Sequence, residues 1–319
     1  MRVLLTGASS FTGLWIANAL AAAGAEVTAV CRGRPERYDA ARRARIEAVG
    51  RRAAVVYDRP FGSDGFRQLV RGALPFDVLC LHHAEVGDFR RPDYQPLEAA
   101  RSNTLNLAEL LAGMRRRGLR RLVHTGTVFE AGEGDGDRPL RAIGAYGLAK
   151  TLTAAIVRHA AAEADLEALK VTIPSPFGPG QVSGVLGHLT RCWCAGQPAV
   201  LGQPEQVRDF VPVDLLAAHY AAVALGHGPA PAGGRSSPSG HVETVEAFAG
   251  RVARELRPRL GLACVIEACR PPQPSLEPRR RFNTEPLAGL FDPAARARHF
   301  DQLAPACAGD ATPISTRAA

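Results

Sequence analysis

Short apolar runs alternate with longer segments of mixed polarity over the first half of the chain. The apolar runs predict strands at residues 2–5, 26–31, 53–57, 76–81, 119–125 and 169–173. The segments between them predict helices at residues 14–24, 38–49, 66–71, 103–117 and 145–164. This regular alternation predicts an α/β fold, a doubly wound parallel sheet with helices on both faces.

The pattern changes after residue 173. Prolines and glycines crowd residues 174–180, a return segment follows at 208–225, and residues 226–240 are rich in Pro, Gly and Ser. We therefore expect a larger domain from residues 1–173 with the return segment 208–225. A smaller C-terminal domain is expected from residues 174–207 and 226–319. The tail from about Cys307 is expected to be mobile.

Composition narrows the classes of partner. The chain of 319 residues carries a net charge of +8, which by itself favours nucleic-acid binding. The arginines are dispersed, however, and the only lysines are Lys150 and Lys170, so no nucleic-acid partner is expected. There is no long apolar run for a membrane span and no room for a signal peptide before the first strand, so the expected location is the cytoplasm. The seven cysteines lack zinc-like spacing, and we expect reduced thiols and no metal site.

Residues 6–13, T-G-A-S-S-F-T-G, join the first strand to the first helix. Gly7 permits a tight turn, and Gly13 lets the helix pack close to the strand. A helix that begins here offers N–H groups and a positive dipole end to a phosphate. The usual middle glycine is replaced by Ser10, whose hydroxyl is placed to cap the helix or contact the pyrophosphate. This stretch predicts a Rossmann dinucleotide site with contacts from Gly7, Ser9, Ser10, Phe11, Thr12 and Gly13.

The end of the second strand bears on the choice of cofactor. An acidic residue usually stands there and binds the ribose hydroxyls, but this chain has Cys31 followed by Arg32 and Arg34. Two guanidinium groups suit a 2′-phosphate, so NADP(H) is favoured and NAD(H) is the alternative. Asp58, after the third strand, is a candidate to bind the adenine amine. The loop after the fourth strand, with His82 and Ala84, is expected beside the nicotinamide.

The chemical centre is expected at Tyr146 and Lys150. Their spacing places both side chains on one face of the long helix. A phenol near a lysine ammonium deprotonates more easily than a free phenol, and it can then exchange a proton with an alcohol or a ketone. A hydroxyl from the end of the fifth strand would orient the substrate oxygen. Thr127 is the first candidate for this role and Thr125 is the second.

These motifs together resemble the extended short-chain dehydrogenase/reductase family, the NAD(P)-dependent epimerase/dehydratase group. The matching segments also include Phe177-Gly178-Pro179-Gly180 and residues 208–214, R-D-F-V-P-V-D, and they cover about residues 1–225 in the family's order. The resemblance implies a Rossmann domain with a small C-terminal substrate-binding domain, a nucleotide-linked sugar as substrate, and a homodimer formed by helices 103–117 and 145–164. It also implies cofactor contacts from Asn103, Thr125, Lys150 and Pro174, and substrate contacts from Glu85, Thr127, Tyr146, Ser175 and Arg208. The family usually has asparagine at the position of Ser175.

Departures from the family pattern limit the reaction. Sugar dehydratases of this family carry an Asp-Glu pair after the catalytic threonine, whereas Thr127 is followed by Val128 and Phe129. Thr125 is followed by Gly126 and Thr127, so dehydration is not expected. The first reading is a 4-epimerase that oxidises and re-reduces a sugar hydroxyl with one retained cofactor. The alternatives are an NADPH-dependent reductase of a keto-sugar or small ketone, and a non-catalytic dinucleotide-sensing protein.

Overall fold

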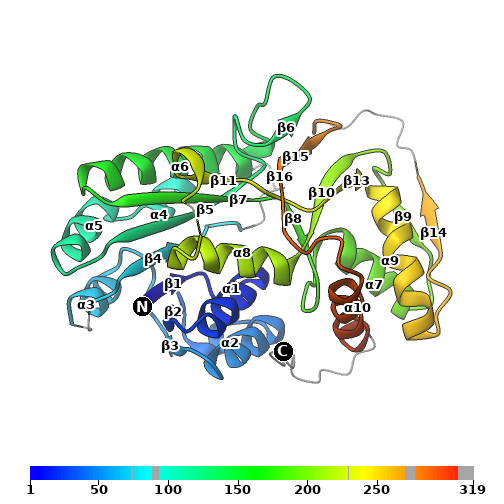
Figure 1. Ribbon diagram of the computed structural model, residues 1–319, viewed down its shortest axis with the longest axis horizontal. Helices are drawn as coiled ribbons and strands as arrows, with labels where there is room; N and C mark the ends of the chain where they lie inside the picture. Colours follow the sequence, from blue (N-terminus) through cyan, green and yellow to red (C-terminus); the bar gives the residue numbers. More distant parts are fainter. Residues whose placement is uncertain (73–74, 88–92, 229, 270–276, 308–319) are drawn as a thin grey trace. The chain divides into compact units, whose positions relative to one another are not determined.

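The chain folds into two units (Figure 1). The computed structural model describes residues 1–72, 75–87, 93–228, 230–269 and 277–307. The larger unit comprises Met1–Glu133, Leu140–Ile173 and Ala217–Ser237. The smaller unit comprises Gly134–Pro139, Pro174–Leu216 and Pro238–Ala319. Each unit therefore uses several separate stretches of the chain.

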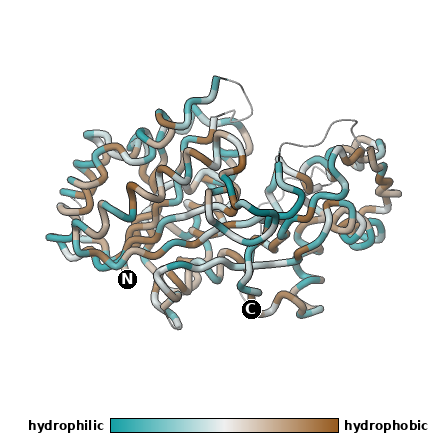
Figure 2. Tube along the Cα trace, turned by 90° about the horizontal axis from the view of Figure 1, so that it is seen from above, coloured by the Kyte–Doolittle hydropathy of each residue, from teal (hydrophilic) through white to brown (hydrophobic). Residues whose placement is uncertain are grey.

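A parallel sheet forms the centre of the larger unit. Its seven strands follow the order β11-β7-β5-β4-β1-β2-β3, and every neighbouring pair is parallel. The strands are β1 (Arg2–Thr6), β2 (Glu26–Val30), β3 (Ala54–Val56), β4 (Val78–Leu81), β5 (Arg121–Thr127), β7 (Glu167–Ile173) and β11 (Arg235–Ser236). This arrangement confirms the predicted doubly wound parallel sheet of the Rossmann type. Hydrophobic residues gather along these strands (Figure 2).

Helices cover both faces of this sheet (Figure 1). Helices α3 (Asp64–Gly72), α5 (Leu107–Arg116) and α6 (Gly144–Glu163) bury apolar side chains against Leu79 and Leu122 on one face. Helices α1 (Phe11–Ala22), α2 (Ala40–Gly50) and the later turns of α8 (Val213–Leu225) lie on the other face. A short 3-10 helix, η1 (Pro35–Arg37), precedes α2, and another, η2 (Ala232–Gly234), precedes β11. Because parallel strands end at a common edge, the loops after β1, β4 and β5 meet there.

One predicted helix is wrong in its limits. Residues 103–117 are not continuous, because α4 (Pro96–Asn103) ends where that helix was expected to begin and α5 starts only at Leu107. The break lies at Asn106, whose backbone is left-handed with φ of 55°. The Asn106 side chain donates a hydrogen bond to the Gly62 carbonyl at 2.8 Å. Asparagine tolerates this left-handed conformation, so a turn at Asn106 can separate α4 from α5 although the two helices have similar polarity.

The smaller unit combines a three-stranded sheet with helices. Strand β10 (Val207–Pro212) pairs with β8 (Ser175–Phe177) and β13 (His241–Thr244). Three two-stranded ladders join β9 (Ala199–Leu201) to β14 (Ile266–Ala268), β12 (Pro238–Ser239) to β16 (Glu285–Pro286), and β6 (Asp135–Gly136) to β15 (Arg281–Phe282). Helices α7 (Gly184–Cys194), α9 (Val245–Leu260) and α10 (Pro293–Cys307) pack around an aromatic core that includes Phe177, Phe210 and Phe248.

The division of the chain differs from the expected one at three places. Gly134–Pro139 belongs to the smaller unit, because β6 pairs there with β15. The start of the return segment belongs to the smaller unit, because β10 pairs there with β8 and β13. Residues 226–237 belong to the larger unit, because β11 extends the sheet beside β7. The tail after Cys307 lies outside the described residues. Across the described ranges, no helix is long and apolar enough to cross a membrane.

Candidate active site

The loop between β1 and α1 requires glycine at two positions. Gly7 has a φ of 76°, and a Cβ placed there would lie 2.8 Å from the backbone nitrogen of His83. A Cβ on Gly13 would lie 2.2 Å from the carbonyl oxygen of Gly7. Both contacts are closer than real Cβ atoms show, so any larger residue would distort the loop. The two glycines therefore keep the backbone of this loop tightly folded at the start of α1.

Ser10 caps helix α1, which is one of the two roles predicted for it. Its Oγ accepts a hydrogen bond from the Gly13 N–H at 3.0 Å and donates to the Gly7 carbonyl at 2.9 Å. The first turn of α1 contains no acidic residue that would oppose an anion. The positive end of the helix and the close-packed glycine backbone fit the pyrophosphate of a dinucleotide. The contacts predicted for Ser9, Phe11 and Thr12 stay predictions.

His82 connects this loop to the end of β5. Its Nε2 lies 2.9 Å from Thr12 Oγ1 and 3.2 Å from Ser10 Oγ, and its Nδ1 lies 3.0 Å from Thr125 Oγ1. Burial lowers the pKa of His82 to about 3, helped by the charges of Lys150 and His83. His82 is therefore neutral at neutral pH. It joins three hydroxyl groups from the loops that the fold brings to one edge.

The loop after β4 is held by Asn103. The Asn103 Oδ1 accepts a hydrogen bond from the Glu85 backbone N–H at 2.6 Å, and its Nδ2 donates to Thr153 Oγ1 at 3.2 Å. His83 lies between Thr6 Oγ1 at 2.8 Å and the Asn103 carbonyl at 3.1 Å. These bonds give Asn103 a structural task in addition to its predicted cofactor contact. They also fix the backbone on either side of Ala84.

Both arginines proposed for the 2′-phosphate have acidic partners. Arg32 pairs with Glu85 at 2.5 Å, and Arg34 pairs with Asp58 at 3.2 Å. The two arginine side chains are 66% and 72% exposed, so their charges are accessible to a ligand. Asp58, predicted to bind adenine, has a left-handed backbone with φ of 56°. A 2′-phosphate at this position would compete with two carboxylates for the guanidinium groups.

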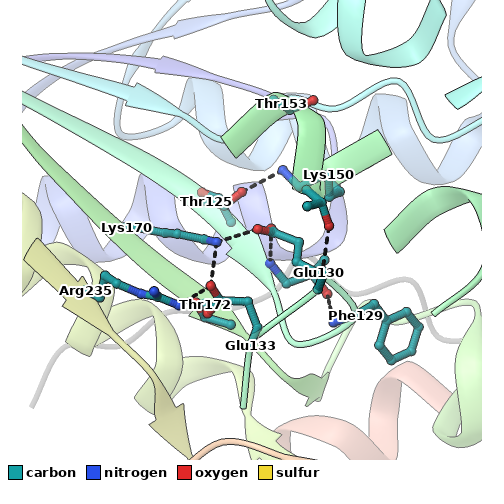
Figure 3. Close-up of polar contacts among 12 residues, drawn as sticks. Thr125, Phe129, Glu130, Glu133, Lys150, Thr153, Lys170, Thr172 and Arg235 are labelled. Atoms are coloured by element: carbon teal, nitrogen blue, oxygen red, sulfur yellow. Dashed lines mark hydrogen bonds and ion pairs between the residues drawn. The ribbon is translucent and has the colours of Figure 1, made fainter. Parts of the chain in front are cut away.

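The predicted catalytic lysine lies at the end of β5. Lys150 is only 3% exposed, and its Nζ donates to the Thr125 carbonyl at 2.6 Å (Figure 3). Burial lowers the pKa of Lys150 to about 8, while the nearby Glu130 carboxylate opposes this change. Tyr146, in the first turn of α6, has a pKa above its ordinary value because of burial and the charges of Glu130 and Tyr94. The side chains of the tyrosine-lysine pair thus sit in a desolvated environment with a carboxylate nearby.

The two candidate hydroxyls differ in their surroundings. Thr125 Oγ1 lies 3.0 Å from both His82 Nδ1 and Tyr220 OH, so it is engaged inside the protein. Thr127 Oγ1 accepts a hydrogen bond from the Phe129 N–H at 3.3 Å. The choice of Thr127 over Thr125 as the catalytic hydroxyl stays a prediction.

The site contains a charged group that sequence analysis missed. Glu130 accepts a hydrogen bond from the Thr127 N–H at 2.8 Å and forms an ion pair with Lys170 of β7 (Figure 3). Lys170 also binds Glu133 at 3.0 Å. The useful signal was the lysine count, since the chain has only two lysines and both lie here.

Three predicted site residues, Arg208, Ser175 and Pro174, belong to the smaller unit. Arg208 is 6% exposed, and its guanidinium donates to Glu277 Oε2 at 2.9 Å and to the Pro278 carbonyl at 3.1 Å. Ser175 begins β8 and is the register partner of Phe210 in β10. Pro174 immediately precedes that strand. Their predicted contacts with cofactor or substrate stay predictions.

Comparisons with known proteins identify a family and similar folds. The model of the NAD dependent epimerase/dehydratase family matches residues 3–231. A UDP-glucuronic acid 4-epimerase variant from Bacillus cereus, solved with a substrate analogue and NAD, is 17% identical with a TM-score of 0.74, and the match covers 96% of this chain and 99% of that one. A UDP-glucose 4-epimerase from Thermotoga maritima is 20% identical with a TM-score of 0.67, covering 89% and 90%.

A further solved structure represents another reaction of the family. The dTDP-glucose 4,6-dehydratase from Bacillus anthracis, in complex with NAD, is 14% identical with a TM-score of 0.70, and the match covers 95% of both chains. No curated protein matches the chain in sequence. These similarities to solved structures concern the fold, whereas the family match extends over most of the sequence. The chain belongs to the NAD-dependent epimerase/dehydratase family, the extended short-chain dehydrogenase/reductase group.

Proposed function

We propose that the protein is an NAD(P)-dependent 4-epimerase of a nucleotide sugar. The observation that carries the proposal is the meeting of Lys150 and the Thr125–Thr127 segment of β5, with Tyr146 one turn before Lys150 on α6. The glycine loop reaches the same sheet edge through His82. Two of the solved structures with this fold are UDP-sugar 4-epimerases, which supports the choice of reaction.

The catalytic residues have distinct roles in this proposal. Tyr146 takes the proton from the sugar hydroxyl and later returns it, which requires its phenolate. Thr127 donates a hydrogen bond to the same sugar oxygen and orients it. Lys150 contributes a positive charge that favours the phenolate and offers donors to the ribose hydroxyls. When bound, the nicotinamide supplies the hydride acceptor and a further positive charge.

The remaining assignments concern ligands and assembly. Arg208 is proposed to bind the diphosphate in place of Glu277, and Ser175 and Glu85 to contact the sugar nucleotide.

NADP(H) is proposed over NAD(H) because Arg32 and Arg34 expose two guanidinium groups, although the three solved relatives named above include two with NAD. A homodimer through residues 103–117 and α6 is proposed because Leu105, Leu148 and Ile156 expose 41%, 45% and 41% of their surface. A cytoplasmic location stays a prediction.

The alternative reading is an NADPH-dependent reductase, and the arginine pair favours it. The non-catalytic sensor is disfavoured, since such proteins typically lose the tyrosine or lysine.

The decisive experiment identifies nucleotides released from the purified protein by denaturation and then assays UDP-glucose, UDP-glucuronic acid and UDP-N-acetylglucosamine. Near-stoichiometric cofactor together with interconversion of C4 isomers supports the epimerase. An empty protein that consumes NADPH with a keto-sugar supports the reductase and contradicts the epimerase.

A further inference from the structure

The two lysines of this chain lie in one group of polar contacts. The chain has 39 Lys and Arg residues in total, and all of them except these two lysines are arginine. Lys150 is the predicted catalytic lysine on α6, and Lys170 lies on β7, in register with His124 of β5. A compact ammonium is therefore used twice where the chain otherwise uses a guanidinium. The first use belongs to the expected catalytic pair, and the second has no role in that pair.

Lys170 lies between two buried carboxylates (Figure 3). Its ammonium pairs with Glu130 and, at 3.0 Å, with Glu133. The two glutamates are 1% and 4% exposed. Glu133 has additional partners, because it accepts a hydrogen bond from Thr172 at 2.9 Å and pairs with Arg235. Two acids and two bases thus form a neutral cluster that runs from the end of β5 to the exposed side chain of Arg235.

Space at this point explains why a lysine is used. A Cβ on Gly126 would lie 2.3 Å from Lys170 Cε and 3.1 Å from Glu130 Oε1. Glycine at residue 126 therefore lets the amine pass beside β5 and reach Glu130. The planar guanidinium of arginine is larger and would not occupy the same space without moving the loop.

Glu130 is held next to the first turns of α6. Its Oε1 accepts the Thr127 N–H at 2.8 Å. The neighbouring Phe129 carbonyl accepts the Ile143 N–H at 2.8 Å, and a Cβ on Gly147 would lie 2.3 Å from that carbonyl. The loop that carries Glu130 is thus pressed against the turn that carries Tyr146. This placement fixes a carboxylate beside the catalytic pair.

The charge of Glu130 acts on both catalytic side chains in the same direction. It raises the pKa of Tyr146, adding to burial, and it also opposes the lowering of the Lys150 pKa by burial. Burial raises the pKa of Glu130 itself, while Lys170 and Lys150 favour its charged form. The titratable groups that face Glu130 are therefore Lys170 from β7 and Lys150 and Tyr146 from α6, with Glu133 and Arg235 beyond Lys170.

We propose that Glu130, held by Lys170, is a positioning residue that sets the pH range in which Tyr146 exchanges its proton. The proposal rests on the proposed function of Tyr146 as the catalytic base. The Lys170 ammonium neutralises part of the Glu130 charge, and the remaining charge disfavours the phenolate. Glu130 also fixes the backbone of Thr127 through its other oxygen, so one carboxylate controls both the geometry and the electrostatics of the site.

The test compares variants by the pH dependence of kcat/KM. Glu130→Gln and Glu130→Met both remove the charge, and each is expected to move the acidic limb to lower pH by about one unit. Glu130→Asp keeps the charge and is expected to retain the wild-type limb. Glu133→Gln is the matched control, because it removes a carboxylate from the same lysine on the side of Thr172. It is expected to leave the limb in place.

A direct titration separates this inference from the proposed function. Near-ultraviolet absorbance of tyrosinate, taken as the difference between each protein and its Tyr146→Phe counterpart with oxidised cofactor bound, reports Tyr146 without any substrate. A lower titration midpoint in the two neutral Glu130 variants supports the inference even if no nucleotide sugar is turned over. Midpoints and limbs equal to wild type in both variants would overturn it, even if the protein proves to be an epimerase.

Discussion

The ammonium of Lys150 donates a hydrogen bond to the carbonyl oxygen of Thr125 at 2.6 Å. This contact links the long helix α6 to the last residues of β5, so the tyrosine on the helix and the hydroxyls on the strand keep a constant relation. The lysine is almost completely buried, and its preferred partner in the protein is a neutral backbone group. Burial disfavours the charge of Lys150, and the nearby Glu130 carboxylate favours it.

Replacing Tyr146 with phenylalanine is expected to lower kcat by about 10²–10⁴-fold, because the variant has no group to exchange a proton with the sugar oxygen. Cofactor affinity is expected to stay within about twofold of wild type, since the phenol is not assigned to cofactor binding. Steady-state turnover and calorimetric cofactor titration measure the two quantities. Unchanged turnover would remove Tyr146 as the base.

Valine substitutions at Thr125 and Thr127 are expected to affect different quantities, the free energy of unfolding for Thr125 and kcat for Thr127. Thr127→Val should lower kcat by at least about tenfold, because the variant cannot donate a hydrogen bond to the substrate oxygen. Thr125→Val should lower the free energy of unfolding by about 1–3 kcal/mol, because His82 Nδ1 and Tyr220 OH both lose a buried partner. Urea unfolding and kcat measured on both variants distinguish them. A larger loss of kcat in a stable Thr125→Val protein would make Thr125 the catalytic hydroxyl.

The double substitution Arg32→Ala and Arg34→Ala tests cofactor choice. If the guanidinium groups bind a 2′-phosphate, NADPH affinity should fall by at least about tenfold while NADH affinity changes little. Fluorescence titration with both cofactors gives the ratio. Arg37→Ala, in the neighbouring 3-10 helix, serves as a control for the general loss of positive charge. Equal losses for the two cofactors would contradict the phosphate role.

Stability is expected to fall as the pH is lowered below about 6.5, the ordinary pKa of histidine in the unfolded chain. Burial lowers the pKa of His82 to about 3 and that of His83 to about 4, and it lowers the pKa of His124 as well. The unfolded chain therefore binds more protons, and each such histidine should cost about 2 kcal/mol of unfolding free energy at about pH 5.

Urea unfolding at about pH 7.5 and about pH 5 measures this loss. His124 offers a specific check, because neither of its ring nitrogens has a hydrogen-bond partner among the described groups. His124→Leu should reduce the difference between the two pH values. Equal unfolding free energies at both pH values in the wild type would show that the buried histidines do not control acid sensitivity.

The dimer prediction depends on α6. Leu148 and Ile156 lie on one side of this helix, eight residues apart, and expose 45% and 41% of their surface. Replacing both with glutamate is expected to convert a dimer to a monomer, because carboxylates cannot be buried unpaired at an apolar interface. Light scattering after gel filtration gives the mass. Val200→Glu, at an equally exposed position in β9, is the control and should leave the mass unchanged.

Sequence reasoning was most successful where one residue type is required by geometry. The apolar strands and the T-G-A-S-S-F-T-G loop each carry their own local signal, and the structure places the strands in one parallel sheet and the loop between β1 and α1. The Tyr146–Lys150 spacing lies within helix α6, as expected, and the catalytic role of the pair stays a prediction. Glu130 and Lys170 lacked such a signal, because residues 40 positions apart meet only through the pairing of β5 with β7. The helix break at Asn106 was missed because its flanking segments share the same polarity. The extent of each unit was misjudged because β11 has only two residues in a segment rich in glycine and proline.

The late position of β11 has a consequence for how the protein is made. The last strand of the larger unit's sheet, β11, pairs with β7. In the chain, β11 comes after Pro174–Leu216, which belongs to the smaller unit. During synthesis, β7 therefore remains an open sheet edge until residue 236 has left the ribosome, and exposed edges of this kind recruit other strands. A fragment ending at residue 173 would contain the cofactor loop and the tyrosine-lysine pair, yet it would lack both β11 and α8. We expect such a fragment to aggregate rather than to fold as an isolated cofactor-binding domain.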